Sequence, residues 1–333
     1  MNDQPLDDSR PVKPPALPPL NIAPQIPESP PPIAAWRWWI HLIVLASYVL
    51  GIGLIGALSD DGDAKKGDPA VEQSSEAQAA ADEPAVQPAL SANPGELLFT
   101  VFTQLAIFAA FFGVAWLASR ARRDQLMLRW NRNWWFPWVL GLGYSFAMRI
   151  VIGIIATVLL ATAALWIMAS HGIDFNQAGF DSATTDLGKR FQPNMKHLVD
   201  ADAIENSPLY LFLNATIVSF LLAGFREELW RAGMLAGCRA LFPKLYETRR
   251  GQLVFVVLIA VVFGLGHTPQ GLGGVFLTTL LGIMLGSIMV FHRSIWEATL
   301  AHGFFNAASF VGMHLHYRFK EHFPEIQKML GGG

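Results

Sequence analysis

The stretch Phe225-Arg226-Glu227-Glu228-Leu229-Trp230-Arg231-Ala232-Gly233 places four ionisable side chains between two apolar runs. The residues from Leu209 to Gly224 are almost all apolar, and Met234 and Leu235 continue the apolar pattern afterwards. This pattern predicts that the two glutamates lie on a membrane helix. A charged side chain there costs about 2.5–3.5 kcal/mol on insertion scales, so such residues usually mark a functional site.

Arg231 is within reach of either glutamate on a helix. Glu227 precedes it by four residues and Glu228 by three, so both pairs share a helical face. One arginine can neutralise one carboxylate, and we expect the other carboxylate to stay free.

Two more polar motifs follow, each inside apolar sequence. The first is Phe263-Gly264-Leu265-Gly266-His267 and the second is His302-Gly303-Phe304-Phe305-Asn306. His302 and Asn306 are four residues apart and project from one helical face. We therefore expect two carboxylates, two imidazoles and a carboxamide, carried by three helices, to converge on one polar cavity.

The composition predicts an integral membrane protein of the all-α class. Of the 333 residues, 52% are hydrophobic and only 15% are charged, which exceeds the apolar content of an ordinary soluble domain. The net charge is −2 and the basic residues form short clusters beside apolar segments, so no nucleic-acid partner is expected. Cys238 is the only cysteine, which excludes an intrachain disulfide.

The apolar segments predict a polytopic bundle of about seven transmembrane helices. They are Trp36–Leu58, Leu97–Ser119, Trp134–Ala169, a helix from Pro208 to about Arg239, Gln252–His267, Val275–Phe291 and Ile295–Leu315. Arginine and lysine gather in the loops after the second, fourth and sixth of these segments. By the positive-inside rule these loops are cytoplasmic, which predicts a multi-pass protein of the cell (inner) membrane with a cytoplasmic amino terminus.

The remaining sequence divides the chain into five predicted parts. Residues 1–35 are rich in proline and predict a disordered cytoplasmic tail, and residues 59–96 predict a disordered acidic linker after the first helix at 36–58. Residues 97–316 form the expected core, and residues 317–333 form a carboxyl-terminal tail.

In this order, each on its own predicted helix, the three motifs resemble the CPBP intramembrane proteases, the CAAX-processing and bacteriocin-processing family also called ABI. The family signature is a Glu-Glu pair followed by Arg, then Phe-x-x-x-His, then His-x-x-x-Asn, and the resemblance covers roughly Leu97 to Leu315. It implies an intramembrane endopeptidase that cleaves a membrane-associated peptide or protein, of CAAX type or bearing a leader peptide.

The resemblance also implies roles for the motif residues. Glu227 with His267 would activate water, His302 and Asn306 would donate hydrogen bonds to the oxyanion, and Glu228 with Arg231 would hold the helix face and tune its charge. This sequence departs from the family at one point, since only Leu229 and Trp230 separate Glu228 from Arg231 where the family has three residues. Alignment on Arg231 would put Arg226 in the place of the catalytic glutamate, so that either Glu228 would substitute as the base or the usual catalytic carboxylate would be missing. We favour alignment on the acidic pair, with Glu227 as the base.

Two alternatives stay open at this point. Glu227, His267 and His302 offer oxygen and nitrogen ligands suitable for zinc, although the sequence contains no HExxH motif, so a metal cofactor is not certain. A different class is a non-catalytic immunity or scaffold protein, or an ion or proton pathway, that uses the same intramembrane charges.

Overall fold

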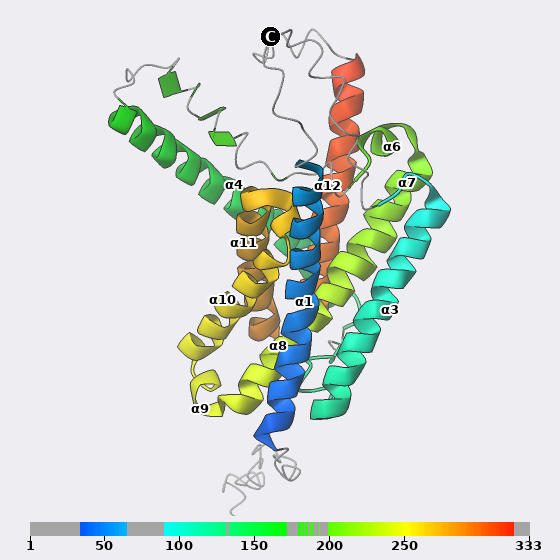
Figure 1. Ribbon diagram of the computed structural model, residues 1–333, viewed down its shortest axis with the longest axis vertical. Helices are drawn as coiled ribbons and strands as arrows, with labels where there is room; N and C mark the ends of the chain where they lie inside the picture. The colour runs from blue at the N-terminus through cyan, green and yellow to red at the C-terminus, as the bar shows by residue number, and fades with distance from the viewer. Residues whose placement is uncertain are drawn as a thin grey trace, which may run out of the picture. The chain divides into compact units, whose positions relative to one another are not determined.

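The computed structural model describes residues 34–64, 90–130, 133–171 and 199–322, with a few positions between 172 and 198 (Figure 1). These residues form helices and no strand, apart from one isolated bridge between Leu90 and Val199. The predicted all-α helical bundle is therefore confirmed. The proline-rich residues 1–33, positions 65–89 of the expected linker and residues 323–333 lie outside the described residues.

Every apolar segment predicted from the sequence is helical. The elements are α1 (Ala35–Ala64), α3 (Pro94–Ser119), α4 (Phe136–His171), α6 (Ala201–Asn206), α7 (Pro208–Leu213), the π-helix η1 (Asn214–Arg226), α8 (Glu227–Leu241), α9 (Pro243–Tyr246), α10 (Arg249–Leu265), the 3-10 turn η2 (Thr268–Gln270), α11 (Gly271–His292) and α12 (Trp296–His322). The short α6 lies between α4 and α7, and α12 continues past the expected end of the core at residue 316.

Five helical segments of the described chain are long and apolar enough to cross a membrane, where the sequence predicted about seven. They are Ala35–Ile55, Pro94–Ser119, Phe136–Ser170, Pro208–Leu241 and Thr268–His292. The other two expected spans are helical but differ in character, because α10 has only 17 residues and α12 carries many polar side chains.

The helix α1 is part of the bundle, although the sequence suggested a span separate from the core. The His41 ring nitrogens lie 2.9 Å from two backbone oxygens, Nδ1 from that of Ala115 on α3 and Nε2 from that of Gly233 on α8. Trp230 Nε1 donates to the carbonyl of Leu45 at 2.8 Å. These buried bonds fix α1 against the helix that begins with the glutamates.

Close packing of η1 on α12 brings the first and third motifs together. A Cβ atom at Gly224 would lie 2.9 Å from the carbonyl oxygen of Thr299, and one at Gly303 would overlap the ring of Phe220. Both glycines therefore allow the backbones to approach closely, as small residues do between membrane helices. Glu228, four residues after Gly224, can then reach His302 beside Gly303.

The π-helix η1 occupies 13 residues directly before Glu227, where the sequence predicted an ordinary helix. Ser219 Oγ donates to the carbonyl of Asn214 five residues earlier at 2.7 Å, within the wider turn of a π-helix. Such helices are rare and occur frequently at functional sites. The wider turn changes which face Glu227 and Glu228 present relative to the residues upstream.

The lengths of α8 and α10 bring Glu227 and His267 to similar depths. At 1.5 Å per residue, Glu227 lies about 21 Å from Leu241, and Leu265 lies about 24 Å from Arg249. The two helices contact each other and are joined by the short α9 (Figure 1). Because α10 is short, its end lies inside the bundle, beside Gly53 of α1.

Candidate active site

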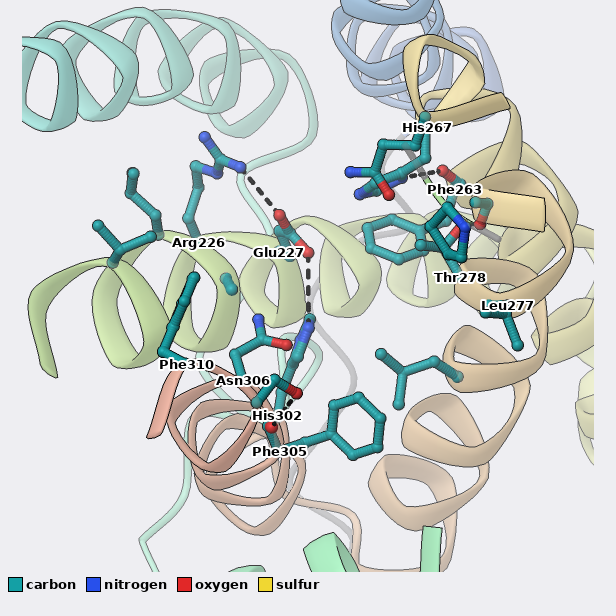
Figure 2. Close-up of a pocket in the computed structure, with 18 of the residues that line it drawn as sticks. Arg226, Glu227, Phe263, His267, Leu277, Thr278, His302, Phe305, Asn306 and Phe310 are labelled. Atoms are coloured by element: carbon teal, nitrogen blue, oxygen red, sulfur yellow. Dashed lines mark hydrogen bonds and ion pairs between the residues drawn. The ribbon is translucent and has the colours of Figure 1, made fainter. Parts of the chain in front are cut away.

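Four of the six predicted site residues line one cavity of about 470 Å³. They are Glu227 at the start of α8, His267 after the end of α10, and His302 and Asn306 one turn apart on α12 (Figure 2). Most of the remaining wall is apolar and comes from η1, α11 and α12. The expected meeting of three helices is therefore present for these four side chains.

Glu227 is held by an arginine that the sequence analysis did not place in the site. Its Oε1 accepts a hydrogen bond from Arg226 Nη2 at 2.9 Å, and its Oε2 lies 3.9 Å from His302 Nε2. Arg226 Nη1 in turn donates to Gln104 Oε1 on α3 at 2.7 Å. The expectation that one carboxylate stays free is wrong, because Arg226 pairs with Glu227 while Arg231 pairs with Glu228.

Glu228 and Arg231 form a sealed ion pair behind the cavity. Their side chains are 0% and 1% exposed, and Arg231 Nη1 contacts Glu228 Oε2. The Arg231 guanidinium also lies over the ring of Phe263, 4.7 Å from its centroid. Glu228 therefore does not reach the cavity wall, contrary to the expectation that both glutamates would face it.

His302 connects the sealed pair to the cavity. Its Nδ1 lies 3.0 Å from Glu228 Oε1, and its Nε2 faces Glu227. A carboxylate only accepts hydrogen bonds, so Nδ1 carries the proton of this bond. Nε2 can donate as well only when the ring is doubly protonated, with one carboxylate on each side.

His267 is oriented by its own helix end. Its Nδ1 lies 2.9 Å from the carbonyl oxygen of Phe263 four residues earlier, and the two rings are 4.6 Å apart. Because a carbonyl oxygen only accepts, Nδ1 is the donor, and in the neutral ring Nε2 is then the acceptor. The Phe-x-x-x-His spacing thus fixes a histidine with a free acceptor nitrogen.

A second cavity of about 280 Å³ adjoins the same residues. Both cavities are lined by Gln104, Arg226, Glu227, Phe263, His267 and Gln270, and α1 adds Tyr48, Val49 and Ile52 to the second. The sequence analysis missed Gln104 and Arg226 as site residues. Arg226 could have been found from its place beside Glu227, whereas nothing in the sequence connects Gln104 to a residue 122 positions later.

The zinc alternative finds no support in the arrangement of side chains. Within the described residues, no three His, Cys, Asp or Glu side chains are grouped so that they could hold one metal ion. Glu227, His267 and His302 line the cavity but do not form such a group.

Comparison with known proteins agrees with the three motifs. Residues 209–308, which run from α7 into α12 and contain all three, match the model of the family described as type II CAAX prenyl endopeptidase Rce1-like. No match to the chain was found among curated proteins or among solved structures. The Rce1-like match confirms the resemblance to the CPBP intramembrane proteases for residues 209–308 and supports a membrane protease of CAAX type as the general class of this protein.

Proposed function

We propose that the protein hydrolyses a peptide bond of a membrane-anchored substrate, with Glu227 as the base that activates water. The observation that carries this proposal is the meeting of Glu227, His267, His302 and Asn306 at one cavity. Peptide hydrolysis needs an activated water, donors for the oxyanion and a proton for the leaving amine. These four side chains supply all three.

The attacking water would lie between Glu227 and His267. Glu227 Oε1 is occupied by Arg226, so Oε2 is the oxygen that is available to accept a proton. His267 Nε2 is a second acceptor, because Nδ1 is used by the carbonyl of Phe263. Water attacks the carbonyl carbon as its proton passes to Glu227, and the protonated carboxyl then gives this proton to the amine when the carbon–nitrogen bond breaks.

Asn306 and His302 would stabilise the tetrahedral intermediate. The Asn306 amide is a donor in any protonation state, and it lies one helical turn from His302 on the same face. His302 Nε2 donates only from the doubly protonated ring. Two donors directed at the developing oxyanion provide the electrostatic stabilisation that hydrolysis requires.

The groups around Glu227 and His302 would act as positioning residues. Arg226 holds Oε1 of Glu227 and is itself held by Gln104. Glu228 holds Nδ1 of His302, and Arg231 neutralises Glu228. This division supports the alignment in which Glu227, and not Glu228, takes the catalytic place.

The substrate would be a lipidated or otherwise membrane-anchored peptide that enters laterally from the bilayer or from the cytoplasmic side, where the sequence predicts the basic loops. The apolar side chains Leu222, Leu277, Leu281, Phe310 and Met313 line the larger cavity and favour an apolar ligand. We expect a lipid-anchored peptide to be cleaved efficiently in detergent and the same peptide without its anchor to be cleaved slowly. Equal turnover of both peptides would contradict the membrane-anchored substrate.

The test of the proposal is the pair of variants Glu227→Gln and Glu228→Gln. Glu227→Gln keeps the shape and removes the proton acceptor, so cleavage should fall by about 10²–10⁴-fold, and Glu228→Gln should be milder. Loss of activity only in a Glu228→Gln variant that thermal unfolding shows to be folded would show that Glu228 is the base, as in the alignment on Arg231. Indifference to both changes would favour a non-catalytic scaffold or ion pathway.

Chelation separates the glutamate mechanism from a metal mechanism. We expect a strong chelator to leave cleavage unchanged while the dependence on Glu227 persists. Reversible loss of activity, together with loss of bound zinc in His267→Ala or His302→Ala, would instead assign these residues to a metal.

A further inference from the structure

A third cavity, of about 600 Å³, lies between α4, α10 and α11 and shares no lining residue with the two cavities of the candidate active site. We call it the basic cavity, because Arg249 and Arg293 line it and no acidic side chain does. Tyr144, Gln252, Ser287 and Phe291 also contribute to its wall. Its ligand is therefore expected to be an anion.

The two arginines are the uncommitted donors of the basic cavity. Ser287 Oγ donates to the carbonyl of Ile283 at 2.7 Å, Gln252 Nε2 donates to that of Tyr246 at 2.9 Å, and the Tyr144 hydroxyl lies 2.8 Å from His292 Nε2. Neither Arg249 nor Arg293 forms an ion pair within the part of the chain that the structure describes. A guanidinium presents planar pairs of donors that match a phosphate group.

The position of the basic cavity connects it to the lipid. Arg249 is the first residue of α10 and Arg293 follows the last residue of α11, so both lie where an apolar helix ends. Directly beside them Leu253 is 52% exposed and Phe291 is 78% exposed. An anionic head group beside an apolar surface is the arrangement that a phospholipid offers.

We propose that the basic cavity binds the phosphate group of an anionic phospholipid, with Arg249 and Arg293 as the phosphate ligands and the surface around Leu253 and Phe291 in contact with the acyl chains. This site is independent of the proposed proteolysis, because it shares none of that machinery. The bound lipid would contact α10 and α11, which pack against each other. These two helices also contribute Phe263, Leu277 and Leu281 to the 470 Å³ cavity of the candidate active site.

The experiment compares lipid retention by the full chain and by two double variants in native mass spectrometry, after reconstitution with equal amounts of phosphatidylglycerol and phosphatidylcholine. Arg249→Gln/Arg293→Gln removes the proposed ligands. Arg239→Gln/Arg250→Gln is the matched control, since it removes two exposed charges from neighbouring helix ends outside the cavity. We expect the wild type and the control to retain phosphatidylglycerol, and the cavity variant to hold it about tenfold to thirtyfold less tightly.

Three outcomes would overturn the proposal. Equal loss of lipid in both double variants would show diffuse surface electrostatics, and equal retention of the two lipids by the wild type would show that the head-group charge is not recognised. Displacement of the lipid by inorganic phosphate at a similar concentration would assign the arginines to a free phosphate ion and not to a lipid. Thermal unfolding of each variant in detergent shows that it is folded, so that a loss of lipid can be read as a loss of the site.

Discussion

Glu227 and Glu228 are adjacent in the sequence but lie in different environments. Glu227 faces a cavity, keeps one carboxylate oxygen directed toward His302, and is held by Arg226 from the side of α3. Glu228 is fully buried, and its charge is matched by Arg231, one helical turn later. Two adjacent acidic residues of one helix can therefore have different roles. One carboxylate is accessible from the cavity, and the other is buried and holds the histidine that lies between them.

The largest effect on stability is expected at the buried ion pair of Glu228 and Arg231. Arg231→Gln leaves the carboxylate of Glu228 buried without its cation, which should lower the free energy of unfolding by about 3–5 kcal/mol. Arg226→Gln should lower the free energy of unfolding by clearly less, because Arg226 lies at the wall of the cavity. Both variants are compared by reversible unfolding in detergent and denaturant.

A second variant shows that the missing cation is the cause. Glu228→Gln combined with Arg231→Met removes both charges and should recover most of the lost stability, since no buried charge is left unpaired. Equal destabilisation by Arg226→Gln and Arg231→Gln would remove the distinction between an accessible and a sealed glutamate.

Substitution of a residue that lines the cavity with Glu227 should change activity more than stability. Asn306→Ala removes an uncharged donor from the cavity, so the cleavage rate constant kcat should fall by about 10²–10³-fold with little change in KM. Ser309→Ala is the control, because Ser309 lies on the same helix and cavity wall but its hydroxyl is already engaged: it donates to the carbonyl of Phe305 and accepts from Arg149 Nη2 at 3.1 Å. A rise in KM alone would show that Asn306 binds the substrate in its ground state and does not stabilise the intermediate.

The close packing of α12 on η1, which places His302 beside both glutamates, depends on Gly303. A methyl group there would overlap the Phe220 ring and push α12 away from η1, which should lower the free energy of unfolding by about 1–3 kcal/mol and weaken the contact of His302 with both glutamates. Gly312→Ala on the same helix is the control, because its Cβ would meet nothing within 4 Å. If Gly303→Ala is as stable and as active as Gly312→Ala, close packing at Gly303 does not place His302 beside both glutamates.

The sequence alone predicted the helical segments and the four motif residues that line the cavity. Apolar runs interrupted by charge are local signals, and the spacing of His302 and Asn306 predicts their common face without any knowledge of the fold. The choice of partner for Arg231 was open between two residues at helical spacing. It depends on the face that η1 and α8 turn toward α12, which is a tertiary property.

Other features had no local signal. The π-helix η1 has an apolar sequence that fits an ordinary helix equally well, and the close approach of its Gly224 to Thr299 is a tertiary contact. The incorporation of α1 through His41 depends on a contact with Gly233, 192 residues later in the chain. Long-range contacts of this kind decide which polar residue is buried and which lines a site.

The smallest effect is expected at Gln104, the outermost support of Glu227. Its bond to Arg226 is a hydrogen bond to a cation, and the neighbouring ion pair of Arg226 with Glu227 is intact without it, so Gln104→Ala should lower kcat by only about fivefold. Gln104→Met fills a similar space without an acceptor oxygen and should be as slow as Gln104→Ala, which a purely steric role of the side chain would not predict. Steady-state cleavage of a lipid-anchored peptide by the wild type and the two variants measures the difference. If both variants match the wild type, Arg226 is positioned by Glu227 alone. A loss greater than 10²-fold in Gln104→Ala would mean that Gln104 itself contacts the substrate, because a single positioning bond is too weak to produce it.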